Sequence, residues 1–206
     1  MLSIRESEGI AGLSTLALDG PDVHAELVPS RGGLLTRLRF GTDDVLFLDE
    51  STLADPTKNV RGGIPVLFPV SGKLPENKYA IDGSEFSLKQ HGFARNKPWR
   101  VVEREFSDHL ARVTIALSDD DGTRAVYPFA FELRMSYTLF AAELRLDVAL
   151  ENRDTRPLPH QLGFHPYFRV LASHKSAARV DTDATVTFDN TTGVEKTFDT
   201  PDFTVR

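Results

Sequence analysis

The sequence predicts an all-β fold, either a β-sandwich or a β-barrel, and three observations support this prediction. Short segments alternate apolar and polar residues, which is the period of a strand with one buried face. Turn-forming residues such as Asp82-Gly83 separate these segments. Helical periodicity is nearly absent, and only residues 51–59 are compatible with one short helix. Many short strands between turns are typical of sandwiches and barrels.

The clearest strand is predicted over residues 131–139. Every odd position from Phe131 to Leu139 is apolar or aromatic, so these side chains share one face of the strand. The same alternation returns over residues 143–151, which predicts an antiparallel hairpin. A second hairpin is predicted over residues 78–88, around Asp82-Gly83. Further strands are predicted at residues 14–18, 25–27, 101–106 and 112–117.

Size and composition indicate an ordinary globular protein. The 206 residues are 40% hydrophobic and 26% charged, and we expect one domain over residues 1–206. The net charge of −6 argues against a nucleic-acid partner. No apolar run approaches membrane-spanning length, and the first residues lack the apolar core of a signal peptide. We therefore expect a cytoplasmic protein without a membrane partner. The absence of cysteine excludes disulfides and thiolate metal ligands.

Two stretches containing histidine are the strongest candidates for a functional site. The sequence HGFAR begins at His91, and GFHPYF contains His165. Each combines a histidine with glycine and aromatic residues at the predicted end of a strand. Such a mixture suits a cleft in which an imidazole meets a small polar ligand beside an apolar wall. A metal site is not expected, because His160 and His165 lie five residues apart and face opposite sides of an extended strand.

Residues 59–69 form an unusual segment. Pro65 and Pro69 exclude a central strand, because each removes a backbone donor. The glycines at 62 and 63 allow a tight backbone next to Arg61. Two interpretations are open: a loop that presses Arg61 toward a ligand, or a rigid edge segment with a solvated arginine. Composition alone favours the second, since most arginines are exposed.

Taken together, these stretches resemble the aldose 1-epimerase (galactose mutarotase-like) family. The matching motifs are RGGIPVLFP from Arg61, QHGFARN from Gln90, YPF from Tyr127 and GFHPYF from Gly163. They occur in the family's order, and the resemblance runs from about residue 17 to about residue 193. It implies a β-supersandwich with a sugar cleft on one sheet. It also implies an isomerase of carbohydrate metabolism that interconverts the α and β anomers of a free hexose without a cofactor.

The resemblance also implies roles for individual residues. His165 corresponds to the general acid that protonates the ring oxygen O5 of the sugar. His91 corresponds to the second active-site histidine, which hydrogen-bonds and orients the sugar. The expected substrate-binding residues are Arg61, which contacts sugar hydroxyls, together with Arg95, Phe93, Tyr167 and Phe168.

The chain also departs from the family. Relatives continue with further strands that carry the glutamate acting as general base, and this part of the family pattern lies beyond residue 206. We therefore expect a fragment or a short form, with exposed sheet edges that favour a homo-oligomer.

Two alternatives to a free-hexose mutarotase stay open. One is a carbohydrate-binding protein without turnover. The other is a hexose-6-phosphate 1-epimerase in which Arg61 and Arg95 face the phosphate, although the hairpin at residues 78–88 favours the non-phosphorylated branch.

Overall fold

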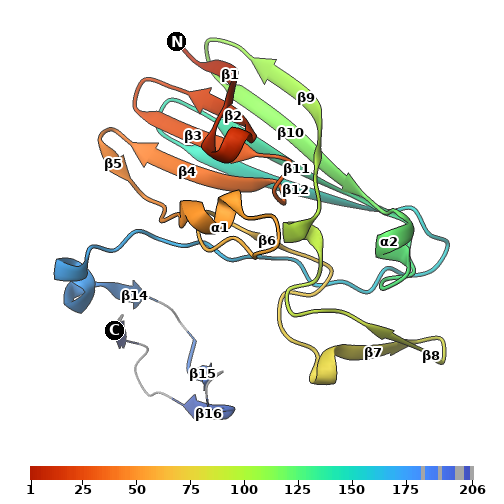
Figure 1. The fold of residues 1–206 in the computed structure, drawn as a ribbon. Helices are drawn as coiled ribbons and strands as arrows, with labels where there is room; N and C mark the ends of the chain where they lie inside the picture. The colour runs from red at the N-terminus through yellow and green to blue at the C-terminus, as the bar shows by residue number, and fades with distance from the viewer. Residues whose placement is uncertain (182–183, 190–191, 198–201, 205–206) are drawn as a thin grey trace. The chain divides into compact units, whose positions relative to one another are not determined.

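The computed structural model describes residues 1–181, 184–189, 192–197 and 202–204. It consists mainly of antiparallel strands, so the predicted all-β class is confirmed. The chain divides into two compact units, Met1–Phe168 and Arg169–Arg206. The larger unit contains both main sheets (Figure 1). The single domain expected over residues 1–206 stays a prediction.

The first sheet contains five antiparallel strands in sequence order. They are β1 (Ser3–Glu8), β2 (Ser14–Asp19), β3 (Val23–Val28), β4 (Leu34–Phe40) and β5 (Asp43–Asp44). The strands predicted at 14–18 and 25–27 correspond to β2 and β3. β1 and β4 were not predicted, because polar residues interrupt the apolar face in both, as Glu6 does after Ile4 in β1.

The second sheet has the order β12-β11-β10-β9. Its strands are β9 (Arg100–Phe106), β10 (Ala111–Ser118), β11 (Phe131–Leu139) and β12 (Leu144–Asn152). β11 has the predicted bounds, and it forms the predicted hairpin with β12, from Leu139 opposite Leu144 to Phe131 opposite Asn152. β12 is an edge strand on which Val148 is 37% exposed. Self-association through such edges stays a prediction.

The two sheets share one hydrophobic core. Leu18 and Leu27 come from the first sheet, and Ile115 and Tyr137 from the second; all four are buried in the same cluster. The hydroxyl of Tyr137 donates a hydrogen bond to the carbonyl of Gly33 across the core at 2.8 Å. The odd-numbered face of β11 is therefore the inner face, as its alternation predicts.

Two short helices lie outside the sheets. α1 (Glu50–Ala54) begins at Asp49, whose carboxylate accepts hydrogen bonds from the amides of Ser51 and Thr52. The short helix predicted within residues 51–59 is present and ends at Ala54, since Pro56 disfavours helical backbone at the preceding residue. α2 (Asp121–Arg124) follows Asp120, whose side chain accepts a hydrogen bond from the amide of Thr123.

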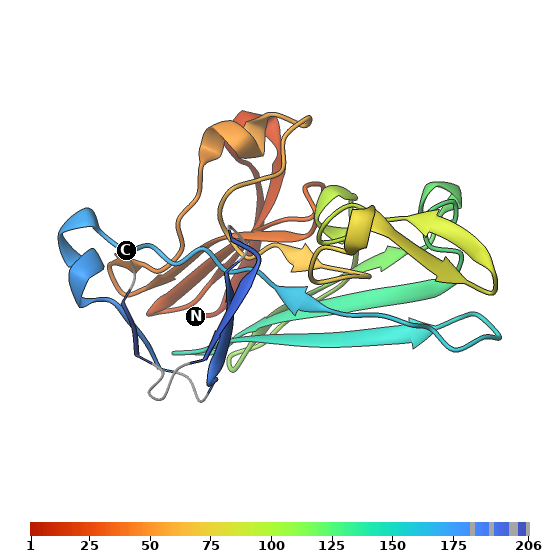
Figure 2. The ribbon, with the colours of Figure 1, turned by 90° about the horizontal axis from the view of Figure 1, so that it is seen from below.

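Smaller strand pairs complete the described chain. β6 (Val66–Leu67) pairs with β13 (Gly163–Phe164), and β7 (Lys78–Ile81) pairs with β8 (Ser84–Ser87) as the second predicted hairpin. Figures 1 and 2 place this hairpin at the end of the first unit where α2 lies. In the second unit, β14 (Arg179–Asp181) pairs with β17 (Asp202–Thr204), and β15 (Val186–Asp189) with β16 (Val194–Thr197). Among the described residues, no helix combines the length and apolarity needed to cross a bilayer.

A buried carboxylate joins strands on the outer face of the second sheet. The side chain of Glu132 is 1% exposed, and it accepts hydrogen bonds from Arg100 at 2.5 Å, Arg134 at 2.6 Å and Ser118 at 3.0 Å. Arg153 adds an ion pair at 3.1 Å. Burial opposes ionisation, but the hydrogen bonds and the arginine charges outweigh it and lower the pKa of Glu132 to about 2.

Replacing Glu132 with glutamine is expected to destabilise the fold by about 1.5–3 kcal/mol near neutral pH, because charged hydrogen bonds are lost. The folded-state pKa lies below the ordinary value of 4.5, so the stabilisation is fully present above that value and is lost as the pH falls toward 2. Urea denaturation at about pH 7 and about pH 3 measures the free energy of unfolding of the wild type and of Glu132→Gln. The difference between the two proteins should be smaller at about pH 3. Glu151→Gln is the matched control, since Glu151 is 59% exposed. Equal losses in the two variants would contradict the assignment.

Candidate active site

His165 lies directly after β13, as predicted, and backbone pairing fixes its position. The segment 161–168 runs antiparallel to the segment 62–69. Its amides donate from Gln161 to the carbonyl of Pro69 at 2.8 Å, from His165 to Pro65 at 3.1 Å and from Tyr167 to Gly63 at 2.9 Å. Within residues 62–69, regular strand pairing is confined to β6, which contains only Val66 and Leu67. The sequence predicts that Pro65 and Pro69 exclude a central strand here, and the paired strand is indeed only two residues long.

His91 sits in a turn after β8, with an unusual positive φ of 69°. Its backbone amide donates to the carbonyl of Gly72 at 2.9 Å. Its ring atom Nδ1 lies 2.7 Å from the carbonyl oxygen of Ser71. A carbonyl oxygen only accepts hydrogen bonds, so Nδ1 carries the proton. In the neutral ring, Nε2 is then left as an acceptor.

The turn brings the two predicted histidines together. The rings of His91 and His165 lie 5.7 Å apart, centroid to centroid, in an edge-to-face arrangement of 71°. The ring of Tyr167 lies 5.0 Å from that of His165 at 33°. His91 and Tyr167 are half-buried and His165 is exposed. Three of the residues proposed from sequence therefore form one accessible group.

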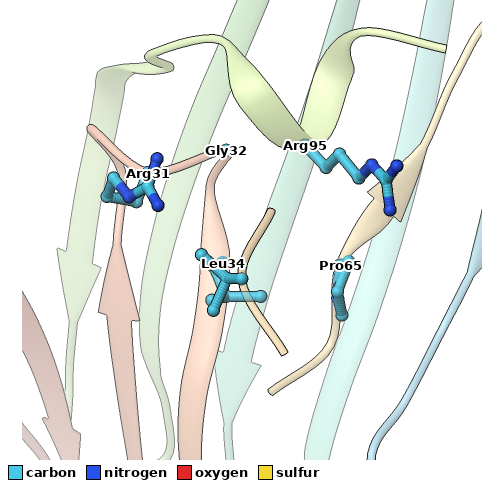
Figure 3. Close-up of a pocket in the computed structure, with 6 residues that line it drawn as sticks. Arg31, Gly32, Leu34, Pro65 and Arg95 are labelled. Carbon is cyan, nitrogen blue, oxygen red and sulfur yellow. The ribbon is translucent and has the colours of Figure 1, made fainter. Parts of the chain in front are cut away.

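Arg95 borders this group. Burial lowers the pKa of the Arg95 guanidinium, and Tyr167 opposes this in part, so the two side chains lie within electrostatic reach. Arg95 lines a small cavity of about 10 Å³ together with Arg31 and Pro65 (Figure 3). Arg31 donates to the carbonyls of residues 52, 53, 55 and 58, whereas Arg95 donates from Nη2 to the carbonyl of Gln90 at 3.2 Å. In the described part of the chain, the buried Nε atom of Arg95 has no hydrogen-bond partner.

The other predicted site residues lie in different surroundings. Phe93 stacks on Phe131 at 6.1 Å and meets Phe68 edge to face, so it packs on the core. Phe168 is 64% exposed and forms a strand bridge with Leu46. Arg61 is exposed, and its backbone amide donates to the hydroxyl of Thr52 at 2.9 Å. The sugar-binding roles of Arg61, Phe93 and Phe168 stay predictions.

Two residues near His91 were not found from the sequence. Gln161 accepts hydrogen bonds through Oε1 from both the amide and the hydroxyl of Ser71, each at 3.3 Å. These residues are 90 positions apart, so no local pattern connects them.

In the part of the chain that the structure describes, no group of three or more histidine, aspartate or glutamate side chains is arranged to hold a metal ion.

Comparison with known proteins gives a consistent result. Residues 16–206 match the model of the family described as "Aldose 1-epimerase". A protein of Salmonella typhimurium named "Putative glucose-6-phosphate 1-epimerase" is 28% identical over 159 residues, covering 77% of this chain and 49% of the relative. The chain thus spans about half the length of the curated relatives it matches.

Solved structures share the fold. The Slr1438 protein of Synechocystis sp. PCC 6803 is 37% identical with a TM-score of 0.86, covering 92% of this chain and 65% of that one. A galactose mutarotase-like protein from Lactobacillus casei is 25% identical with a TM-score of 0.64, covering 76% of this chain and 50% of that one.

Gly92 allows the turn that carries His91, so we expect Gly92→Ala to be more damaging than an ordinary glycine replacement. Gly92 has a φ of 67°, and an added Cβ would lie 2.2 Å from the carbonyl oxygen of Phe68. Gly83 has a similar φ of 79° but open space around it, which makes Gly83→Ala the matched control. The control should cost about 1–2 kcal/mol from backbone strain alone. Gly92→Ala should cost about 1–3 kcal/mol more from overpacking. Urea denaturation measures both, and equal costs would refute the steric argument.

Proposed function

Because this chain belongs to the aldose 1-epimerase family, we propose that it interconverts the α and β anomers of a hexose by acid–base ring opening and closure. The observation that supports this most is the contact between the His91 and His165 rings at 5.7 Å. Two imidazoles from distant segments meet at an accessible surface, and imidazole exchanges protons near neutral pH.

In the proposed reaction, a base removes the proton from the C1 hydroxyl while His165 donates a proton to O5. The C1–O5 bond breaks, and the electron pair of the C1 oxygen forms the aldehyde carbonyl. Rotation about C1–C2 presents the other carbonyl face, and the reverse proton transfers close the ring. His165 is suited to the acid role because its side chain is exposed and adjacent to His91. His91 is suited to orient the sugar, because its Nε2 atom accepts a hydroxyl hydrogen bond.

A phosphorylated hexose is the substrate class that Arg95 favours. Its guanidinium is half-buried beside the histidines, and its Nη2 atom donates to a backbone carbonyl, a contact that leaves the positive charge unneutralised. A phosphate oxygen would bind such a charged group at its terminal nitrogens through a charge-assisted hydrogen bond. The relative named "Putative glucose-6-phosphate 1-epimerase" supports the same substrate class. The predicted preference for a non-phosphorylated sugar, based on the hairpin at residues 78–88, carries less weight than the charge of Arg95 and the names of such relatives.

Sugar binding without turnover is the second candidate. Over the described ranges, neither His91 nor His165 has a hydrogen bond or ion pair to a carboxylate. The family pattern supplies its base from a glutamate, so binding alone fits the groups present in the site. Calorimetry that detects a hexose or hexose phosphate, together with an anomerisation rate equal to that of buffer, would favour this candidate.

The first test is the anomerisation rate of α-D-glucose, α-D-galactose and α-D-glucose 6-phosphate, followed by polarimetry or NMR. We expect a rate above buffer, and a loss of about 10²–10⁴-fold in His165→Ala, which is the usual contribution of one proton-transfer group. His109→Ala is the control, because His109 is exposed in a different loop. Full activity in His165→Ala would contradict the assigned acid, and a wild-type rate equal to buffer would exclude catalysis.

The role of Arg95 predicts a substrate-dependent effect. Arg95→Met should lower kcat/KM for glucose 6-phosphate about 10- to 100-fold, which corresponds to one charge-assisted hydrogen bond, while the value for glucose changes little. Arg95→Lys should be intermediate, because lysine keeps the charge but lacks the planar fork of donors. Equal losses on both sugars would show that Arg95 does not recognise the phosphate.

A further inference from the structure

We propose that Gln161 is a positioning residue that fixes the tautomer and orientation of the His91 imidazole through Ser71. This inference rests on the proposed function for its catalytic meaning, but the arrangement itself is visible in the structure. Gln161 is four residues before His165 on the same segment, and it holds the turn to which His91 is bonded.

The ring and the backbone amide of His91 each donate a hydrogen bond to this turn, and the two acceptors are consecutive carbonyls. The Nδ1 atom of the ring bonds to the carbonyl of Ser71 at 2.7 Å, and the backbone amide bonds to the carbonyl of Gly72 at 2.9 Å. The partner of one ring nitrogen determines which nitrogen carries the proton. The position of the Ser71 carbonyl therefore sets both the direction of the ring and the acceptor character of Nε2.

The turn is only partly packed. The Cβ of Ser71 lies against Gly163, whereas Gly72 is exposed and, apart from its chain neighbours, no atom of the described residues lies within 4 Å of the position that a Cβ would occupy there. Gln161 supplies the side-chain contacts that hold Ser71, since its Oε1 atom accepts from the amide and the hydroxyl at 3.3 Å each. The backbone amide of Gln161 adds a bond to Pro69 at 2.8 Å, which places the side chain beside the turn.

This arrangement couples the two histidines through one short segment. His165 is placed by the pairing of residues 161–168 with residues 62–69, and the same segment restrains His91 through Gln161. A displacement of the segment would therefore move both imidazoles rather than one. Gln161 does not touch the reacting atoms, so it acts by position and not as a catalytic group.

The test is nitrogen-15 NMR of the His91 ring in the full chain, at about pH 8.5, where imidazole is ordinarily neutral. Wild type should show the Nδ1–H tautomer alone. Gln161→Leu removes the acceptor at similar size, and we expect a measurable share of the Nε2–H tautomer. Gln161→Glu retains an acceptor and should restore the Nδ1–H form. Gln90→Leu is the matched control, because Gln90 is exposed beside His91 and should leave the tautomer unchanged.

Activity gives a second readout. Gln161→Leu should lower kcat/KM about 3- to 10-fold, because the loss of one neutral hydrogen bond changes an equilibrium constant by about that factor. Gln161→Glu should recover most of the lost kcat/KM. If Gln161→Leu does not fold, Ser71→Ala removes the hydroxyl half of the contact and should give a smaller change in the tautomer.

The two readouts separate this inference from the proposed function. A tautomer shift in a chain that does not accelerate anomerisation supports the positioning role while the proposed function fails. An unchanged tautomer in Gln161→Leu, or a glutamate variant that resembles the leucine variant, overturns the positioning role whatever the activity.

Discussion

The antiparallel pairing of residues 161–168 with residues 62–69 is the constraint on which the candidate site depends. Hydrogen bonds from the amides of His165 and Tyr167 fix its register. A slip of one residue would turn the side chain of His165 to the opposite face and separate it from His91. Gly63 makes this register accessible, because its φ is 64° and an added Cβ would lie 2.3 Å from the carbonyl oxygen of Leu35. The glycines beside Arg61 are thus required by backbone geometry.

The second half of the site is attached to the core rather than to this pairing. Phe68 is fully buried, and its carbonyl accepts hydrogen bonds from the amides of Phe93 and Ala94 at 3.0 Å and 3.2 Å. Its ring contacts Phe93 and Phe131. The turn that carries His91 is therefore connected to the aromatic core shared by the two sheets. Loss of packing at Phe68 would act on the site through His91, whereas disruption of the pairing would act through His165.

The sequence allowed the prediction of those features that have a local or family signal. The strand 131–139 was predicted with its observed bounds, because strict alternation places one face in the core. The segments of His91 and His165 were singled out from their glycine and aromatic neighbours, and the structure places the two rings 5.7 Å apart, while their roles stay predictions. Phe93 shows the limit of motif-based prediction, since an aromatic residue in a site motif packs equally well on a core. The contact between Ser71 and Gln161 has no local signal, because only the folded chain brings these residues together.

The two histidines differ in a way that agrees with two different roles. A group that orients a substrate gains from a fixed ring, because its hydrogen-bonding atom must keep one direction. His91 has such a ring, bonded through Nδ1 to Ser71. A group that transfers a proton must change its own hydrogen bonding during the reaction, so a ring not already engaged is better suited. The described contacts of His165 are its backbone bond to Pro65 and its ring contacts with His91 and Tyr167. Its nitrogens are thus available to a substrate, and the difference in hydrogen bonding supports His165 as the acid and His91 as the orienting group.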